Sequence, residues 1–385
     1  MKNILKLNSI SPLADKYFEN YNYSDSCENP DGIMLRSFKM HDYETGSNLV
    51  AVARAGAGVN NIPLPQMSEK GICVFNTPGA NANAVKELVV CALLLGSRKI
   101  YEGITWAQSL SKDDDVAKLV EKGKSQFVGG EVYGKTIGVI GLGAIGAKVA
   151  NIAIDLGMDV LGYDPYISVD AAWRLSRKVK HEKSLDALFA GSDYISIHMP
   201  LTPDTKGIIN KDSIASMKDG VCIINCARGE LVNNDDLKEA LKSGKVSCYV
   251  TDFPVGELLG VEGVITIPHL GASTPEAEDN CAVMAAKQLT EYIEHGNVVN
   301  SVNFPNLSGP DAYVHRVTIV HKNVPYMINL ATKPFSDAHI NIDNLVSAGR
   351  GDVGYMILDT EKEVPESVIT ELKAVDGFLK VRVIR

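Results

Sequence analysis

Over residues 1–100, short apolar runs alternate with longer segments of mixed polarity. The runs at 33–35, 49–53 and 72–75 are only a few residues long, as is typical of strands buried on both faces of a parallel sheet. Segments 63–70 and 84–96 have helical spacing. The second is apolar on most sides, which predicts that it packs between two layers of the protein or between two subunits.

From residue 136 onward the alternation becomes regular. The pattern predicts strands at 136–140, 159–163, 194–198, 221–225, 247–251 and 264–267, with helices at 145–156, 184–190, 211–217 and 234–242. Regular βαβ alternation predicts a doubly wound parallel sheet with right-handed crossovers. A long helix at 274–295 and a strand-like segment at 299–304 follow. They predict that the chain leaves this domain and returns to the first one.

A linker-like segment at 305–310 separates this block from a tail with a different pattern. The tail predicts strands at 314–321, 340–347, 354–359 and 378–385, and helices at 325–336 and 365–374. This βαββαβ order is that of a ferredoxin-like unit. Alternating polarity in the last strand predicts one buried sheet face and one face that is open for association.

The predicted fold class is therefore α/β, with two doubly wound parallel-sheet (Rossmann/flavodoxin-like) domains and a small βαββαβ ferredoxin-like domain. The expected boundaries are 1–96 with 283–304 for a discontinuous first domain, 97–282 for the central domain, and 312–385 for the last. A total of 385 residues is long for two domains and short for three of full size.

Composition and charge narrow the class of protein. The chain is 45% hydrophobic with a net charge of −9, so we expect neither a nucleic-acid surface nor an anionic-membrane surface. An anionic ligand would need a few local arginines. The ten N-terminal residues lack the pattern of a secretory signal. The seven cysteines lie mostly in apolar segments and form no CxxC pair, so we expect reduced core cysteines, no metal site and a cytoplasmic location.

A glycine-rich turn follows the strand predicted at 136–140. Gly141, Gly143 and Gly146 form GxGxxG at the start of a predicted helix, and Asp164 follows the next strand. In this setting the first glycine allows the tight turn, the second admits a pyrophosphate and the third lets helix and strand pack closely. Because no arginine adjoins Asp164, a carboxylate would face a 2′-phosphate, and NAD is preferred over NADP.

Ionisable side chains follow three later strands. Arg228 follows the strand at 221–225, Asp252 and Glu257 follow the strand at 247–251, and His269 follows the strand at 264–267. Open α/β sheets bind ligands at the carboxyl ends of their strands. Each of these residues alone is typical of an ordinary surface position, but together, beside a dinucleotide motif, they indicate a catalytic site.

These motifs resemble the D-isomer-specific 2-hydroxyacid dehydrogenases over essentially the whole chain. The resemblance rests on segments 54–62 (RAGAGVNNI), 134–146 (GKTIGVIGLGAIG), 198–203 (HMPLTP), 225–230 (NCARGE) and 268–274 (PHLGAST). It implies a catalytic set of Arg228, Glu257 and His269. Arg228 would bind the substrate carboxylate, His269 would exchange a proton with the C2 hydroxyl, and Glu257 would orient the imidazole and stabilise its charged form.

The same resemblance implies the ligand contacts of both large domains. Asp252 would contact the nicotinamide carboxamide. The implied NAD-binding residues are Gly141, Gly143, Ala144, Ile145, Gly146, Asp164, His198, Pro200, Cys226, Ala227, Arg228, Asp252, His269 and Gly271. The implied substrate-binding residues are Arg36, Lys39, Arg54, Ala55, Gly56, Ala57, Gly58, Asn81, Arg228 and His269. Arg36 and Arg54 would bind a phosphate, which points to 3-phospho-D-glycerate as the substrate. Phe38 stands where a second basic residue follows the Arg-Ser pair in one family pattern.

For the tail, the resemblance implies an ACT domain with regulatory or assembly roles. His321, Asn323 and Asn341 match effector-binding positions, but Tyr326 stands where the pattern favours a small residue. Assembly is therefore favoured over inhibition by serine. Self-association is expected through the NAD-binding domain and through the ACT domain.

Other functions fit the same residues. Within the family, the alternative is a reductase of glyoxylate, hydroxypyruvate or another 2-oxo acid. A protein of another class would sense NAD without catalysis, or would sense an amino acid through its tail. Retention of Arg228, Glu257 and His269 favours an enzyme.

Overall fold

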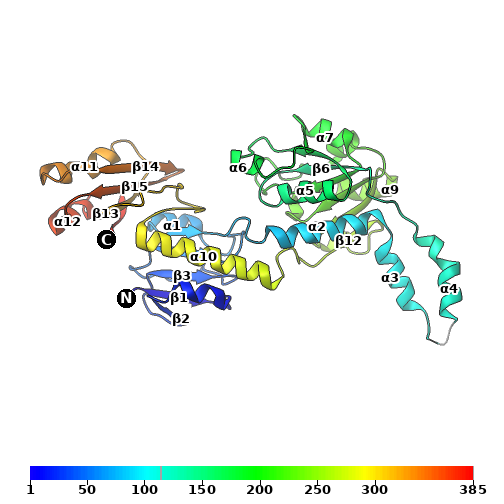
Figure 1. Cartoon of the computed structure of the whole chain (residues 1–385), viewed down its shortest axis with the longest axis horizontal. Coiled ribbons are helices and arrows are strands. Elements are labelled where there is room, and N and C mark those ends of the chain that lie inside the picture. The colour runs from blue at the N-terminus through cyan, green and yellow to red at the C-terminus, as the bar shows by residue number, and fades with distance from the viewer. Residues whose placement is uncertain (113–114, 385) are drawn as a thin grey trace. The chain divides into compact units, whose positions relative to one another are not determined.

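The computed structural model of the chain describes residues 1–112 and 115–384 (Figure 1). Arg385, the last residue of the predicted final strand, lies outside them. The fold divides into two compact units: unit 1 comprises Met1–Asn81 and Pro275–Arg385, and unit 2 comprises Ala82–Thr274. In the described part of the chain, no helix is long and apolar enough to cross a membrane.

Unit 1 contains a five-stranded parallel sheet. Its strands are β1 (Asn3–Leu7), β2 (Asn22–Ser24), β3 (Gly32–Leu35), β4 (Ala51–Arg54) and β5 (Cys73–Phe75), in the order β2-β1-β3-β4-β5. The long helix α10 (Pro275–His295) packs on β3, β4 and β5, beside the short 3-10 helix η1 (Pro12–Tyr17), and α1 (Leu64–Glu69) precedes β5. Small and apolar residues of α10, including Ala285, Ala286 and Leu289, are fully buried against the sheet.

The strands predicted at 33–35, 49–53 and 72–75 are present, as is the helix at 274–295. The sequence pattern does not identify β1 or β2, because only Ile4 and Leu5 of these short edge-side strands are buried. The strand expected at 299–304 is wrong, since this segment makes only one antiparallel bridge, between Phe75 and Ser301. Asn300 there has a left-handed φ of +59°, which interrupts an extended backbone.

Unit 2 is built on a seven-stranded parallel sheet. Its strands are β6 (Thr136–Ile140), β7 (Asp159–Tyr163), β8 (Lys180–His181), β9 (Tyr194–Ile197), β10 (Val221–Asn225), β11 (Val246–Thr251) and β12 (Val264–Thr266), in the order β12-β11-β10-β9-β6-β7-β8. The helices that alternate with them are α5 (Gly146–Asp155), α6 (Val169–Ala172), α7 (Leu185–Gly191), α8 (Lys211–Ser216) and α9 (Asn234–Ser243). The predicted doubly wound sheet is confirmed. Its strand order reverses between β6 and β9, where such folds bind ligands.

The apolar helix α2 (Ala82–Ser97) packs on α5, β10 and β11 of the same unit. Val85, Val89 and Leu93 are buried there with residues of the sheet. One face of α2 thus packs on the sheet and on α5 of its own chain. For this reason the compact unit begins at residue 82, whereas the sequence places the boundary after residue 96.

Two helices that the sequence pattern does not identify follow α2. These are α3 (Ile100–Ser109) and α4 (Val116–Gly123), which both contact the 3-10 helix η2 (Lys124–Phe127). Figure 1 shows α3 and α4 extending away from the sheet of unit 2. No residue of α3 is buried, so the periodic burial that reveals a helix in a sequence is missing here.

The tail forms the four-stranded antiparallel sheet β14-β15-β13-β16. Its strands are β13 (His315–Lys322), β14 (Asn344–Arg350), β15 (Val353–Thr360) and β16 (Phe378–Ile384), and its helices are α11 (Met327–Asp337) and α12 (Glu366–Lys373). The predicted βαββαβ ferredoxin-like topology is confirmed. The two helices pack with one sheet face around Phe335, Leu372 and Met356.

The second face of this sheet is covered by the rest of unit 1, contrary to the expectation of an open face. Tyr355 and Ile357 share one apolar cluster with Tyr292 of α10 and Phe304. The Tyr355 hydroxyl also donates to the Gly296 carbonyl at 2.6 Å. The alternating apolar positions of the strands thus serve an internal packing surface.

Candidate active site

The glycine-rich turn after β6 has the steric features of a dinucleotide site. Gly141 has a φ of +87°, and a Cβ there would lie 2.7 Å from the His198 carbonyl oxygen. A Cβ on Gly146 would lie 1.8 Å from the Gly141 oxygen, so the turn and the start of α5 need both glycines. A Cβ on Gly143 would meet nothing within 4 Å. No contact within the chain requires glycine at position 143. The absence of a side chain there would instead let a ligand approach the backbone at the helix N-terminus.

Asp164, at the end of β7, is fixed by the same turn. Its Oδ2 accepts the Leu142 amide at 2.8 Å and its Oδ1 accepts the Tyr166 amide at 2.9 Å. A carboxylate has further acceptor capacity beyond two hydrogen bonds. Asp164 can therefore accept ribose hydroxyls while its orientation is held by the backbone.

His198 follows β9 and is held against the sheet. Its Nε2 lies 2.8 Å from the Ser196 hydroxyl. Burial lowers the pKa of His198 to about 4, so the imidazole is neutral near pH 7. The other residues expected to bind NAD border the same strand ends: Ala144 and Pro200 are exposed, Ile145 caps α5, Cys226 is buried and Ala227 is half-buried.

Arg228 follows β10 in a loop that is organised by Asn225. The Asn225 Oδ1 accepts the amides of Ala227 and Arg228 at 3.1 and 3.3 Å, and its Nδ2 donates to the Arg228 carbonyl at 2.8 Å. Asn225 is fully buried. The sequence does not identify this positioning role, although an asparagine at the end of a buried strand is the available signal. Arg228 is exposed, and its Nη1 donates to the Ala227 carbonyl at 2.6 Å.

Asp252 fixes the loop that carries His269. It is 1% exposed, and its two carboxylate oxygens accept the amides of Leu270 at 2.7 Å and Gly271 at 2.8 Å. A Cβ on Gly271 would lie 3.0 Å from Oδ2 of Asp252. His269 itself has a left-handed φ of +56°. The structure thus gives Asp252 a role that the sequence does not reveal, which is to hold the backbone beside His269.

Phe253 lies beside both Arg228 and His269. The ring centroids of Phe253 and His269 are 4.8 Å apart, and the Arg228 guanidinium carbon lies 5.9 Å from the Phe253 centroid. The structure therefore brings Arg228 and His269 to one aromatic side chain. Phe253 was not among the expected site residues, because an isolated aromatic residue after a strand carries no distinctive signal.

Glu257 contacts a different residue in this structure. It is an exposed residue of the 3-10 helix η4 (Gly256–Leu258), and its Oε2 accepts Asn234 Nδ2 at 3.4 Å. Among the described residues, no hydrogen bond or ion pair joins it to His269. Only 11 residues separate Glu257 from His269 in the sequence, and this short connection leads from η4 through β12.

In unit 1, two arginines lie together at the ends of β3 and β4. Arg54 Nε donates to the Arg36 carbonyl at 2.9 Å, and Arg54 also donates to the Gly58 carbonyl. The Arg36 guanidinium pairs with Glu278 of α10 at 2.6 Å. Glu278 was not identified from the sequence, because it lies far from Arg36 along the chain. Lys39 is exposed nearby in the sequence.

The loop that follows β4 uses part of its backbone internally. The Ala55 amide donates to the Leu35 carbonyl at 2.8 Å and the Gly56 amide donates to the Arg54 carbonyl at 2.9 Å. These two amides are therefore engaged within the chain, although the resemblance implies Ala55 and Gly56 as substrate contacts. The carbonyl of Ala57 accepts Asn76 Nδ2 at 2.6 Å. Asn81, another expected substrate contact, is half-buried just before α2.

Each of the three expected effector residues has a different contact within the tail. His321 is buried, its Nδ1 lies 2.7 Å from the Lys322 carbonyl oxygen, and its ring packs against Gly354. Asn323 donates to the Gly351 carbonyl at 2.9 Å and Asn341 donates to Asp343 at 2.8 Å. Tyr326 is exposed with a left-handed φ of +77°. The described residues contain no group of three or more His, Cys, Asp or Glu side chains that could hold a metal ion.

Comparison with known proteins agrees with this geometry. Residues 92–271 match the NAD-binding domain model of the D-isomer-specific 2-hydroxyacid dehydrogenases. The D-3-phosphoglycerate dehydrogenase of Haemophilus influenzae is 34% identical over 353 residues, which are 89% of this chain and 82% of that protein. The chain belongs to the D-isomer-specific 2-hydroxyacid dehydrogenase family. It is thus an NAD-dependent oxidoreductase, and the glycine turn, Asp164 and the switch point of unit 2 fit a dinucleotide.

Members of this family with different names are similar to the chain. A hydroxypyruvate reductase of Thermotoga maritima is 40% identical over 64% of this chain and 78% of its own length. The solved structure of NAD⁺-bound 3-phosphoglycerate dehydrogenase from Entamoeba histolytica is 26% identical, covers 80% of this chain and 99% of its own, and has a TM-score of 0.61. Other curated relatives are longer, and the chain spans only 57% and 49% of two of them.

Proposed function

We propose that this dehydrogenase oxidises 3-phospho-D-glycerate to 3-phosphohydroxypyruvate with NAD, the first step of serine synthesis by the phosphorylated route. The observation that carries the proposal is the placement of Arg228 and His269 beside Phe253, at the strand ends of the NAD-binding sheet. A cation and an imidazole at one place are the groups that a 2-hydroxy acid needs. The names of relatives such as the Haemophilus enzyme support the choice of substrate.

The chain's own residues would act in defined ways. Arg228 binds the substrate carboxylate through charge-assisted hydrogen bonds. His269 takes the proton of the C2 hydroxyl during oxidation and returns it during reduction, a contribution of roughly 10²–10⁴-fold. NAD, when bound, accepts the hydride. Asp252 and Asn225 keep the loops of His269 and Arg228 in place. Glu257 would assist His269 only after moving from its contact with Asn234.

The phosphate of the substrate would bind Arg36 and Arg54, with Lys39 as a third cation. Arg54 is held by two backbone carbonyls of unit 1. Arg36 is paired with Glu278, so a phosphate would have to replace that carboxylate. A dianionic phosphate can do so because it offers more charge and more acceptor oxygens than one carboxylate.

The test is a substrate panel measured with NADH at neutral pH. We expect kcat/KM for 3-phosphohydroxypyruvate to exceed the values for hydroxypyruvate and glyoxylate by at least tenfold. Arg36→Ala and Arg54→Ala should raise KM for the phosphorylated substrate and leave the unphosphorylated ones unchanged. Lys322→Ala, an exposed residue of β13, is the control. Equal kcat/KM values across the panel would refute the assignment.

The second candidate is a hydroxypyruvate or glyoxylate reductase. It is favoured by the Arg36–Glu278 pair, which already neutralises one expected phosphate ligand, and by the similarity to the Thermotoga reductase. A reductase of unphosphorylated acids would show no substrate-selective effect of Arg36→Ala.

A non-catalytic NAD-binding protein is the alternative of another class. His269→Gln separates it from an enzyme, because His269 is exposed and its loop is held by Asp252 instead of by its own ring. We expect this variant to bind NAD normally and to lose at least 100-fold in kcat. A wild-type protein that binds NAD but turns over no 2-oxo acid would support the sensing role.

For the tail we propose an ACT-type unit that serves assembly and not inhibition by serine. His321 is buried, and the exposed Tyr326 occupies the position that favours a small residue. We expect millimolar serine to leave the rate unchanged. Inhibition that is abolished by Asn341→Ala would contradict this expectation.

A further inference from the structure

Two of the seven cysteines stand side by side on neighbouring strands of unit 2. Cys222 of β10 and Cys248 of β11 are direct partners in the sheet register, next to an irregularity between Val221 and Cys222. As register partners on parallel strands, the two side chains point to the same face of the sheet, so their thiols are neighbours. Neither residue belongs to the dehydrogenase site, since Arg228 and Asp252 follow further along these strands.

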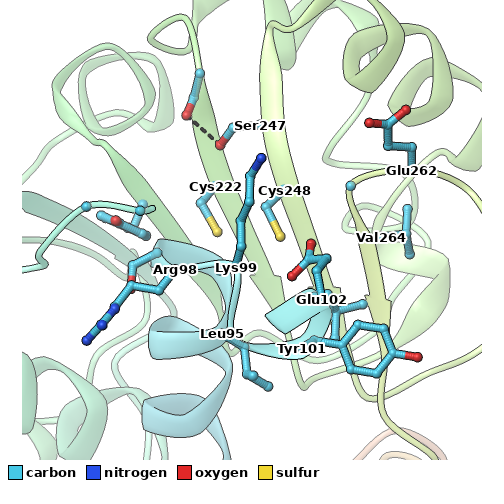
Figure 2. A pocket seen from close by; sticks show the side chains of 18 of the residues that line it. Leu95, Arg98, Lys99, Tyr101, Glu102, Cys222, Ser247, Cys248, Glu262 and Val264 are labelled. Carbon is cyan, nitrogen blue, oxygen red and sulfur yellow. Dashed lines mark hydrogen bonds between the residues drawn. The ribbon is translucent and has the colours of Figure 1, made fainter. Parts of the chain in front are cut away.

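Both thiols line a cavity of unit 2. The cavity has a volume of about 920 Å³ and is bordered by the segment from α2 to α3, by the starts of β10 and β11 and by residues 260–268. Figure 2 shows both sulfur atoms pointing into it, beside Lys99 and Glu102. A ligand that enters this cavity therefore meets two sulfurs together.

The pair is held in place by its surroundings. Cys222 is 2% exposed and Cys248 is 9% exposed. A Cβ on Gly96 of α2 would lie 2.5 Å from the Cys222 sulfur and 3.9 Å from the Cys248 sulfur, so both sulfurs lie against this helix position. The interaction with the neighbouring thiol raises the pKa of Cys222, which burial raises further, and lowers the pKa of Cys248. Cys248 is thus the more nucleophilic member of a fixed pair.

The geometry decides which chemistry the pair suits. A direct disulfide needs sulfurs about 2.05 Å apart and a Cβ–S–S–Cβ dihedral angle of about ±85–100°. A single bridging atom with bonds of about 2.3 Å to sulfur tolerates a separation near 3.8 Å. A metal ion would lack further ligands, because the described residues offer no group of three or more metal-binding side chains. A trivalent arsenic atom that carries one organic substituent is satisfied by two sulfurs alone.

We propose that Cys222 and Cys248 form a dithiol site that binds monosubstituted trivalent arsenicals through both sulfurs. An arsenoso compound R–As=O reacts with the two thiols to form two As–S bonds. The oxygen leaves as water together with the two thiol protons, and neither arsenic nor sulfur changes its oxidation state. The cavity provides room for the organic substituent.

The test uses phenylarsine oxide and the whole native protein, with intact mass spectrometry as the readout. We expect one equivalent to bind, with the loss of two free thiols and reversal by 2,3-dimercaptopropanol. Cys222→Ser and Cys248→Ser should each weaken binding at least tenfold. Cys91→Ser is the control, because Cys91 is exposed on α2 and lies near Cys226, and it should bind like wild type.

A second measurement needs no variant. Wild-type protein with and without phenylarsine oxide is alkylated, and the cysteines are mapped by peptide mass spectrometry. We expect protection of Cys222 and Cys248. Protection of Cys91 and Cys226 instead, or one tight equivalent retained in Cys222→Ser, overturns the dithiol site. These readouts do not depend on enzymatic activity, so their failure is distinct from failure of the proposed function.

Discussion

The role of Asp252 can be tested by removing its charge while keeping its shape. Asp252 is almost fully buried and accepts the amides of Leu270 and Gly271 at 2.7 and 2.8 Å. In Asp252→Asn, one oxygen becomes an NH₂ group that faces a backbone donor, and the other becomes a neutral acceptor. Hydrogen bonds to a charged group stabilise by about 1.5–3 kcal/mol, against about 0.5–1.5 kcal/mol for neutral pairs. The loop should therefore lose about 2–4 kcal/mol of local stability.

This loss has a measurable size. At 1.36 kcal/mol per tenfold, amide hydrogen exchange at Leu270 and Gly271 should accelerate by roughly 30- to 900-fold. Because His269 immediately precedes these amides, kcat/KM should fall at least tenfold. Hydrogen-exchange mass spectrometry on the peptide around His269, together with steady-state kinetics, provides both values.

The matched control is Asp155→Asn, since Asp155 is an exposed residue at the end of α5. It should leave exchange and kinetics within error of wild type. If Asp252 acted only as a contact for the nicotinamide carboxamide, Asp252→Asn would raise KM for NAD without changing exchange at Leu270 and Gly271. That result would refute the positioning role.

Further outcomes follow from three other features. Gly143→Ala should weaken NAD binding at least tenfold without lowering the melting temperature, because its Cβ meets nothing in the chain. Gly146→Ala should lower both NAD affinity and the melting temperature, since its Cβ would lie 1.8 Å from a carbonyl oxygen. NAD titration and thermal melts measure these two quantities. The pKa of His198 is about 4 in the folded chain and 6.5 in its ordinary state, so the unfolded chain binds more protons between these values and stability should fall as the pH drops from 6.5 toward 4. His198→Asn should flatten that slope in urea melts, and an unchanged slope would contradict the assignment. Arg316 and Asp359 form a buried pair at 2.6 Å, so Asp359→Asn should destabilise unit 1 by about 3–5 kcal/mol in urea unfolding; a loss below 1 kcal/mol would show that the pair is not buried in solution.

The sequence predicts well those features that depend on local spacing. Short apolar runs identify the buried parallel strands, because both faces of such strands are covered and nearly all of their residues are therefore apolar. Gly146 is required by a contact within its own turn, with the Gly141 oxygen, and Gly141 by its positive φ, although a Cβ on Gly141 would also meet the distant His198 carbonyl. The ferredoxin-like order of the tail follows from the alternation of its strands and helices. The strand β1, the edge strands β2 and β8 and the helices α3 and α4 bury too few residues to leave such a pattern.

In the candidate site, the sequence identifies ionisable residues but not the contacts that they make. The sequence identifies Arg228 and His269 as ionisable residues after strands, but not Phe253 as the side chain that both contact. It places Glu257 near His269 along the chain, while the structure directs its carboxylate to Asn234. Glu278 reaches Arg36 only because α10 packs on the first sheet.

The sequence by itself determined the parallel sheets, the dinucleotide turn and the order of the tail, since each depends on residues that are neighbours along the chain or recur with a fixed period. Only the tertiary structure decided how the carboxylates are used. Asp252, Glu257 and Glu278 are the same chemical group in sequence. Asp252 is buried and accepts two backbone amides, so it is a structural acceptor. Glu257 is a surface residue that contacts Asn234. Glu278 is the counter-ion of Arg36. The same holds for the cysteines, because register alone places Cys222 beside Cys248.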